Sequence, residues 1–136
     1  MALAQTGGGY QMGDGNLNEV QIDFSAPVQT ATSTATLTVA QVLGNILVGN
    51  PSTTAASYTL PTVAAVEAVL TNNKVGSTFE LTIVNLGTST GVITVLAGTG
   101  FTLVGQMTMP TAAAGASGQF RFQKTGTGAW SVYRVA

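Results

Sequence analysis

The segment that most restricts the fold is residues 77–97, STFELTIVNLGTSTGVITVLA. Apolar and polar residues alternate with a period of two on both sides of a polar, glycine-containing stretch, residues 85–91. Such alternation, rich in Val, Ile, Thr and Phe, is typical of half-buried β-strands, and Asn, Gly, Ser and Thr commonly close hairpin loops. We therefore predict a β-hairpin here, with Phe79, Leu81 and Ile83 on one face of its first strand.

The C-terminal part of the chain repeats this pattern. Residues 119–124 alternate with Phe120 and Phe122 on one face, and a second alternating segment, residues 129–135, follows the turn residues 125–128. Shorter strand-like segments precede them, at residues 34–38, 45–48, 56–60, 101–104 and 106–109. Short strands separated by turns about every ten residues predict an all-β fold. We expect an antiparallel β-sandwich or jelly-roll-like barrel.

Helix signals are few. One short helix is predicted over residues 62–71, where Thr62 can cap the N-terminus and apolar residues fall on a single face. A helix this short is marginal by itself, so it must pack on the sheets. A single helical turn is also expected after Thr38, because Gln41 stands where a capping box requires it and Gly44 can end the turn.

The N-terminal residues differ from the rest of the chain. Residues 1–25 are dense in glycine, which raises the entropic cost of ordering them. We interpret them as an extended arm, and residues 26–136 as the β-sandwich domain. The arm could dock along the sheet edge of a neighbour, or it could be a tail with one local strand. Its candidate contact residues are Tyr10, Leu17, Val20, Ile22 and Phe24.

Charged residues make up only 7% of the chain, against about 25% in an average protein. Because a monomer normally relies on surface charge for solubility, we predict that copies of the chain or a larger assembly cover much of the surface. The alternative is a monomer with a surface of Ser, Thr, Asn and Gln. Residues 1–73 hold four acids and no cation, whereas residues 74–136 hold four cations and one acid, 4 − 1 = +3. An acidic arm could therefore meet a basic domain, within one chain or between neighbouring chains, or the uneven distribution of nine charges could be chance.

The composition disfavours catalysis. The chain contains no cysteine and no histidine, which removes thiolate chemistry, the commonest metal ligand and the usual general base. Of the five acidic residues, only Glu67 and Glu80 lie outside the arm. No nucleotide-binding motif is present. The sequence from Asp14 does not match an EF-hand calcium-binding loop, because Glu19 and Ser25 occupy the positions where the loop needs Gly and Glu. We expect no enzymatic activity, no metal and no cofactor.

Membrane and nucleic-acid partners are also not expected. No apolar run approaches the ~20 residues of a membrane span, and the first residues lack the features of a secretory signal. The predicted C-terminal hairpin places three cations, Arg121, Lys124 and Arg134, among aromatic residues. Surfaces that bind single-stranded nucleic acid combine the same residue types. Three cations on a chain of net charge −1 are few for binding that depends on charge. We interpret them as a basic rim that contacts a protein partner.

Several stretches carry a resemblance to a known family. They are AQTGGGYQMGDGNLNEV, LTVAQVLGNILVGNPSTTAASYTLPT, VGSTFELTIVNLGTSTGVITVLAGTGFTLVG and GQFRFQKTGTGAWSVYRV. Here the chain resembles the capsid decoration (cement) proteins of tailed phages, especially those of cyanobacterial and other aquatic hosts. The resemblance implies a homotrimer on the outer surface of the capsid that bridges subunits of the major capsid protein. It transfers no catalytic residue. The alternatives are a trimeric β-rich receptor-binding or baseplate module of a phage tail, and a bacterial surface domain.

Overall fold

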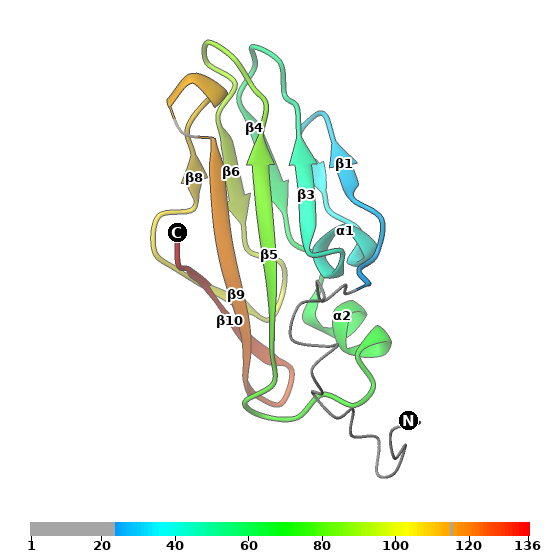
Figure 1. Cartoon of the computed structure of the whole chain (residues 1–136). Coiled ribbons are helices and arrows are strands. Elements are labelled where there is room, and N and C mark those ends of the chain that lie inside the picture. The colour runs from blue at the N-terminus through cyan, green and yellow to red at the C-terminus, as the bar shows by residue number, and fades with distance from the viewer. Residues whose placement is uncertain (1–23, 115) are drawn as a thin grey trace, which may run out of the picture.

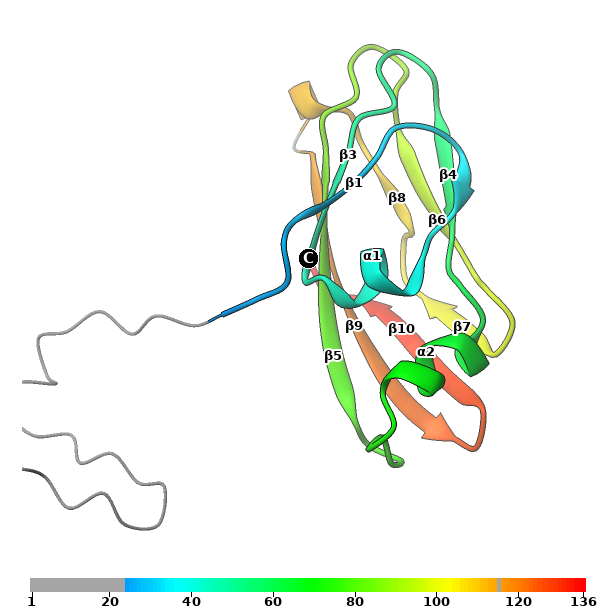
Figure 2. The same cartoon turned by 90° about the vertical axis from the view of Figure 1, so that its right-hand side faces the viewer.

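The computed structural model describes residues 24–114 and 116–136, which are rich in β-structure and build two sheets (Figure 1). Sheet A has six strands, in the spatial order β1 (Gln29–Ala31), β3 (Ile46–Gly49), β5 (Thr78–Asn85), β9 (Ser117–Gly126), β10 (Ala129–Arg134) and β7 (Phe101–Val104). Sheet B has four, in the order β2 (Ala35–Thr36), β4 (Ala56–Thr59), β6 (Ile93–Leu96) and β8 (Thr108–Met109). The two sheets form two layers that face each other (Figure 2).

The expected antiparallel arrangement is wrong for most strand pairs. In the described residues the pairs β1–β3, β3–β5, β7–β10, β2–β4 and β4–β6 are parallel, and only β5–β9, β9–β10 and β6–β8 are antiparallel. The reason is the path of the chain, which crosses from sheet A to sheet B after β1, β3 and β5. A strand that follows such a crossover returns to its sheet in the same direction as the one before.

The predicted hairpin of residues 77–97 is therefore also wrong, although both of its strands exist. β5 pairs with β3 and β9 in sheet A, whereas β6 pairs with β4 and β8 in sheet B. The intervening loop carries the chain from one layer to the other. The face assignment is confirmed, since Leu81 and Ile83 are buried and Phe79 packs against the core. The C-terminal hairpin is confirmed as the antiparallel pair β9–β10.

Both helix signals are confirmed. α1 (Val39–Leu43) begins with the complete capping box of Thr38 and Gln41. In α2 (Val63–Val69), the Thr62 hydroxyl accepts a hydrogen bond from a backbone N–H of the first turn, and the two valines of the inner face are buried. α2 lies across one end of the two sheets (Figure 1). A 3₁₀ turn, η2 (Ala112–Ala114), lies between β8 and β9.

The core lies between the sheets and draws buried side chains from both. Its aromatic part sits near the end covered by α2. The Phe79 and Phe122 rings stack with centroids 4.5 Å apart, and Phe101 meets Phe122 edge-on at 5.7 Å. Trp130 completes the group, 5.5 Å from Phe79. Aromatic pairs of this kind add stability beyond their buried area, so these four rings strengthen the packing at this end of the core.

Candidate interaction surface

The charged side chains of the described residues are confined to a small part of the fold. They are Glu67, Lys74, Glu80, Arg121, Lys124 and Arg134. Residues 24–66 and 81–120 contain none. All four strands of sheet B therefore lack charge, and so do the β3–β4 and β5–β6 loops at the end opposite α2 (Figure 1). Charge is thus absent from all of sheet B and from one end of the molecule, and in sheet A it is absent from β1, β3 and β7.

The outer face of sheet B is lined with hydroxyl groups. Its core-facing residues, such as Tyr58 and Ile93, are buried, and the residues between them point outward. Two rows of outward residues cross the strands: Ser57, Thr94 and Thr108 in the first, and Thr36, Thr59 and Leu96 in the second. We call these six residues the sheet B face. Depletion of charge is the mark of an interface core, so this face is the candidate interaction surface.

The geometry of the sheet B face suits contact with another protein surface. All six residues are partly or fully exposed, and the Thr94 and Thr108 hydroxyl oxygens lie 3.0 Å apart, within hydrogen-bond distance. Hydroxyls that bond to one another can be covered without leaving a buried polar group unpaired. One pair of hydroxyls on this face is thus already satisfied, and none of its six residues is charged, so no charge opposes its burial.

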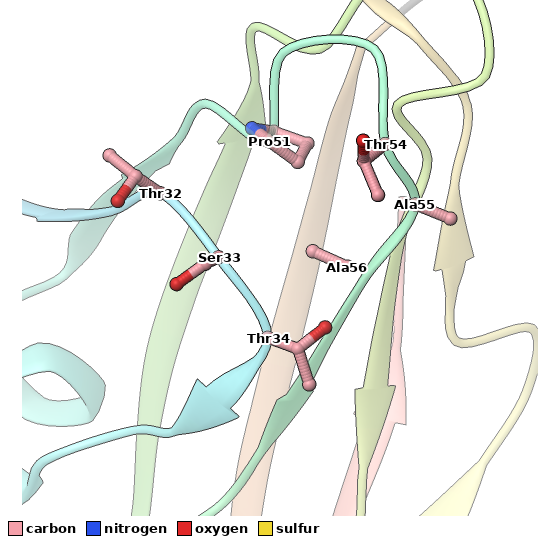
Figure 3. A pocket seen from close by; sticks show the side chains of 7 residues that line it. All are labelled: Thr32, Ser33, Thr34, Pro51, Thr54, Ala55 and Ala56. Carbon is pink, nitrogen blue, oxygen red and sulfur yellow. The ribbon is translucent and has the colours of Figure 1, made fainter.

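A groove near the end of the molecule opposite α2 is similarly uncharged (Figure 3). It has a volume of about 420 Å³, and its lining residues are Thr32, Ser33, Thr34, Pro51, Thr54, Ala55 and Ala56. One wall is the connection between β1 and β2, and the other is the β3–β4 loop. The Ser57 backbone N–H donates to the Thr34 hydroxyl at 3.0 Å, which holds the two walls together. Methyl groups and hydroxyls dominate the lining, so shape would decide what enters.

A second cavity, of about 260 Å³, lies beside α2. It is lined by Leu70, Asn72, Asn73, Ser77, Thr78, Phe79 and Trp130. Much of its polar lining is already engaged within the chain. The Asn73 amide donates to the Leu70 carbonyl and its oxygen accepts from Lys124, while the Ser77 hydroxyl accepts from the Lys74 backbone N–H at 3.0 Å. Few groups are left here to orient a polar ligand.

The three residues of the predicted basic rim all have partners within the chain. Arg121 Nη2 donates to Glu80 Oε1 at 2.6 Å, and Lys124 Nζ donates to Glu67 Oε1 at 2.5 Å. The Arg134 guanidinium donates to backbone carbonyls, those of Gln106, Thr108, Ser117 and Ala136. Of the two ion-paired cations, Arg121 is the more exposed, with 54% of its side chain accessible to solvent. A contact of the rim with a partner stays a prediction.

Glu67 joins α2 to the β9–β10 hairpin. Its Oε1 accepts hydrogen bonds from Lys124 and, at 2.9 Å, from Trp130 Nε1. The hydrogen bond from Lys124, followed by that from Trp130, lowers the pKa of the Glu67 carboxyl below its ordinary value. No local sequence motif indicates this cluster, because its members are far apart in the chain.

We expect acid to weaken the fold through Glu67 and Glu80. Hydrogen bonds from Lys124 and Arg121 lower the pKa of Glu67 and Glu80 respectively. A carboxyl whose pKa is lower in the folded chain stabilises the fold at pH values above its pKa in the unfolded chain, about 4.5. This contribution is lost as the pH falls through the pKa of the folded chain. The melting temperature should therefore be flat between about pH 6 and 8, where no histidine titrates, and fall in acid.

Thermal unfolding followed by circular dichroism across this pH range checks the prediction. The matched variant is Glu67→Gln, which keeps the shape of the side chain but cannot ionise. It should melt lower at neutral pH and lose less stability on acidification than the original chain. Identical pH profiles for the two proteins would show that the Glu67 cluster does not stabilise the fold.

The predicted arm is only marginally represented in the described residues. Phe24 is 99% exposed, and Ser25 is exposed as well. The other predicted contact residues, Tyr10, Leu17, Val20 and Ile22, lie outside the described residues. The assignment of residues 1–25 as an arm stays a prediction.

Residues 24–114 and 116–136 bring together no metal-binding cluster and contain no helix suited to crossing a membrane. In this part of the chain, no three His, Cys, Asp or Glu side chains gather as a metal site would require. None of the helices described there combines the length and apolarity needed to cross a membrane. No family model, curated protein sequence or solved structure matches this chain.

Proposed function

We propose that this chain is a structural protein of a phage virion that decorates and stabilises the outer surface of the capsid as a homotrimer. Its partner in this proposal is the major capsid protein, whose neighbouring subunits the trimer bridges. The two sheets then act as a rigid β-sandwich, jelly-roll-like in its layers but not in its strand directions. The observation that carries the proposal is the concentration of uncharged surface on sheet B and the loops opposite α2, within the described residues.

An uncharged, hydroxyl-rich sheet face supports this role for a physical reason. Burying an unpaired charge in an interface is strongly unfavourable, and the sheet B face contains none. Each contact made through threonine methyls and hydroxyls is weak. When a symmetric shell holds many such contacts at once, the linked binding events gain effective concentration and the assembly becomes stable.

The N-terminal arm has a separate part in the proposal. Residues 1–25 reach across a joint and contact a sister subunit or the shell through their spaced apolar residues. Phe24, the described member of that set, is almost fully exposed, so a partner could cover it. A large exposed aromatic ring is unfavourable in water and gains from such a contact.

The experiment is binding to capsids stripped of this protein. The double variant Thr59→Lys and Thr94→Lys places two cations on the sheet B face, where both side chains are partly exposed and a lysine can extend into solvent without unfolding the chain. Burying these charges at an interface should weaken binding at least about tenfold, equivalent to about 1.4 kcal/mol. Co-sedimentation with the stripped capsids measures the loss.

Val75→Lys is the matched control, because Val75 is 65% exposed in the loop between α2 and β5 and lies outside the sheet B face. It should bind as the original chain does. Equal binding by the double variant would remove the sheet B face from the proposal. Binding of the original chain to purified tails and not to capsids would instead favour a receptor-binding or baseplate module.

A further inference from the structure

The outer face of sheet A carries a group of partly or fully exposed aliphatic side chains. They are Val28, Ile46, Val48, Val84 and Leu86, which we call the aliphatic patch. The register pairs Val48 with Val84, and Ile46 lies two residues before Val48 on the same face. The Leu86 backbone N–H donates to the Gly49 carbonyl at 2.7 Å, which places Leu86 beside the end of β3. Val28 continues the register of β1 opposite Ile46.

The aliphatic patch differs from the rest of the same face. Further across sheet A, the outward positions hold the Glu80–Arg121 ion pair and the side chain of Gln119, which donates to Glu80. Within the patch, Val28 and Leu86 are 53% and 46% exposed. The register places Thr30 opposite Val48 and Thr82 opposite Ile46, so threonines border these aliphatic side chains. A group of exposed aliphatic side chains with a polar border is a candidate site for another segment to cover.

The sequence offers an occupant for this site. In residues 20–24, Val20, Ile22 and Phe24 alternate with polar residues, so an extended segment would present the three on one face. The chain enters sheet A through β1, directly beside the patch. Residues that match the patch in chemistry thus stand next to it in the chain.

The described residues that lead into β1 leave Phe24 uncovered by its own domain, so another copy could cover it. Residues 24–28 are all exposed, and they leave the body on the side of the outer face of sheet A (Figure 2). The Pro27 carbonyl accepts from Gln29 Nε2 at 2.9 Å, which helps to fix the direction of departure. Phe24 makes almost no contact with its own domain.

Charge favours the same pairing. Residues 1–23 contain Asp14, Glu19 and Asp23 and no cation, a net charge of −3. Residues 24–136 contain four cations and two acids, 4 − 2 = +2. The two parts of the chain therefore carry opposite net charge, and salt screens the resulting long-range attraction. The patch itself contains no cation, so this attraction brings the parts together but does not select the patch.

We propose that the aliphatic patch binds residues 20–24 of a neighbouring copy, so that copies of this chain exchange their N-terminal segments. The inference rests on the proposed function, because it specifies how the trimer is held together before it meets a capsid. An exchanged segment links copies without requiring a large rigid interface between their domains.

Disulfide trapping in solution tests the exchange, and the absence of cysteine from the chain removes any background. One protein carries Ile22→Cys and the other Val84→Cys, and the two are refolded together from urea under mild oxidation by glutathione disulfide, so that mixed assemblies form. We expect a disulfide-linked heterodimer on a non-reducing gel, formed at least about tenfold more than with Val75→Cys as the second protein. Lowering the salt concentration should increase the yield.

Three results would overturn the inference. The first is a heterodimer yield no greater than that of the Val75→Cys control. The second is a double variant, Ile22→Cys with Val84→Cys, that closes only within single chains, since the segment would then cover its own patch. The third is efficient pairing of Val84→Cys with itself, which would join patch to patch. Because no capsid is present, each result leaves capsid binding to be judged separately by co-sedimentation.

Discussion

Replacing Trp130 with alanine is expected to lower the free energy of unfolding by about 3–5 kcal/mol. The side chain is 1% exposed, its ring lies 5.5 Å from that of Phe79, and its Nε1 donates to Glu67 at 2.9 Å. Alanine would leave a cavity in the aromatic end of the core and remove one hydrogen bond from the Glu67 carboxylate. Urea unfolding followed by circular dichroism measures the loss, since the variant no longer contains tryptophan.

Trp130→Phe separates the two contributions of this side chain. It retains an aromatic ring near Phe79 but has no N–H to donate to Glu67. We expect a smaller loss in the free energy of unfolding than for the alanine variant. Stability should also respond less to acid than in the original chain, because the pKa of Glu67 would be less depressed. An alanine variant as stable as the original chain would contradict the packing described for this end of the core.

Replacing Asn85 with alanine is the second change with a large expected effect, a loss of about 3 kcal/mol or more. Asn85 is fully buried at the end of β5. Its amide donates to the Gly91 carbonyl at 2.9 Å and to the Pro110 carbonyl at 2.8 Å, and its oxygen accepts from the Gly87 N–H at 2.7 Å. Alanine would leave these three backbone groups without their partner. The side chain thus fixes the loop that carries the chain between the sheets.

Two further variants make this prediction specific. Asn72→Ala, at an exposed position after α2, should change the free energy of unfolding by less than about 0.5 kcal/mol. Asn85→Asp can still accept from the Gly87 N–H, but its carboxylate would face two carbonyl oxygens. Burial raises the pKa of such a carboxyl, so this variant should regain stability as pH falls. Urea unfolding of all three variants provides the comparison.

Local features of the fold could be predicted from the sequence, and long-range features could not. The capping box of Thr38 and Gln41 depends on residues three positions apart, and it formed as expected. The burial of Leu81 and Ile83 follows from a period of two that any strand shows. That period is the same for parallel and antiparallel partners, so it did not reveal that β5 and β6 belong to different sheets.

The candidate interaction surface was only partly accessible from the sequence. The low share of charged residues predicted a covered surface, but the place of that surface depends on which strands share a sheet. The absence of charge from residues 24–66 and 81–120 is visible in the sequence and would have been the best available signal. The Glu67 cluster had no such signal, because Lys124 and Trp130 lie 57 and 63 positions along the chain from Glu67.

The most direct test of a decoration role is an electron-microscopy map of the intact particle whose genome encodes this chain. We expect three-fold density on the outer surface of the capsid, into which the two-layered domain fits with its sheet B face covered by a sister subunit or by the shell. Density for this chain only on the tail, or a particle that lacks the protein altogether, would contradict that role.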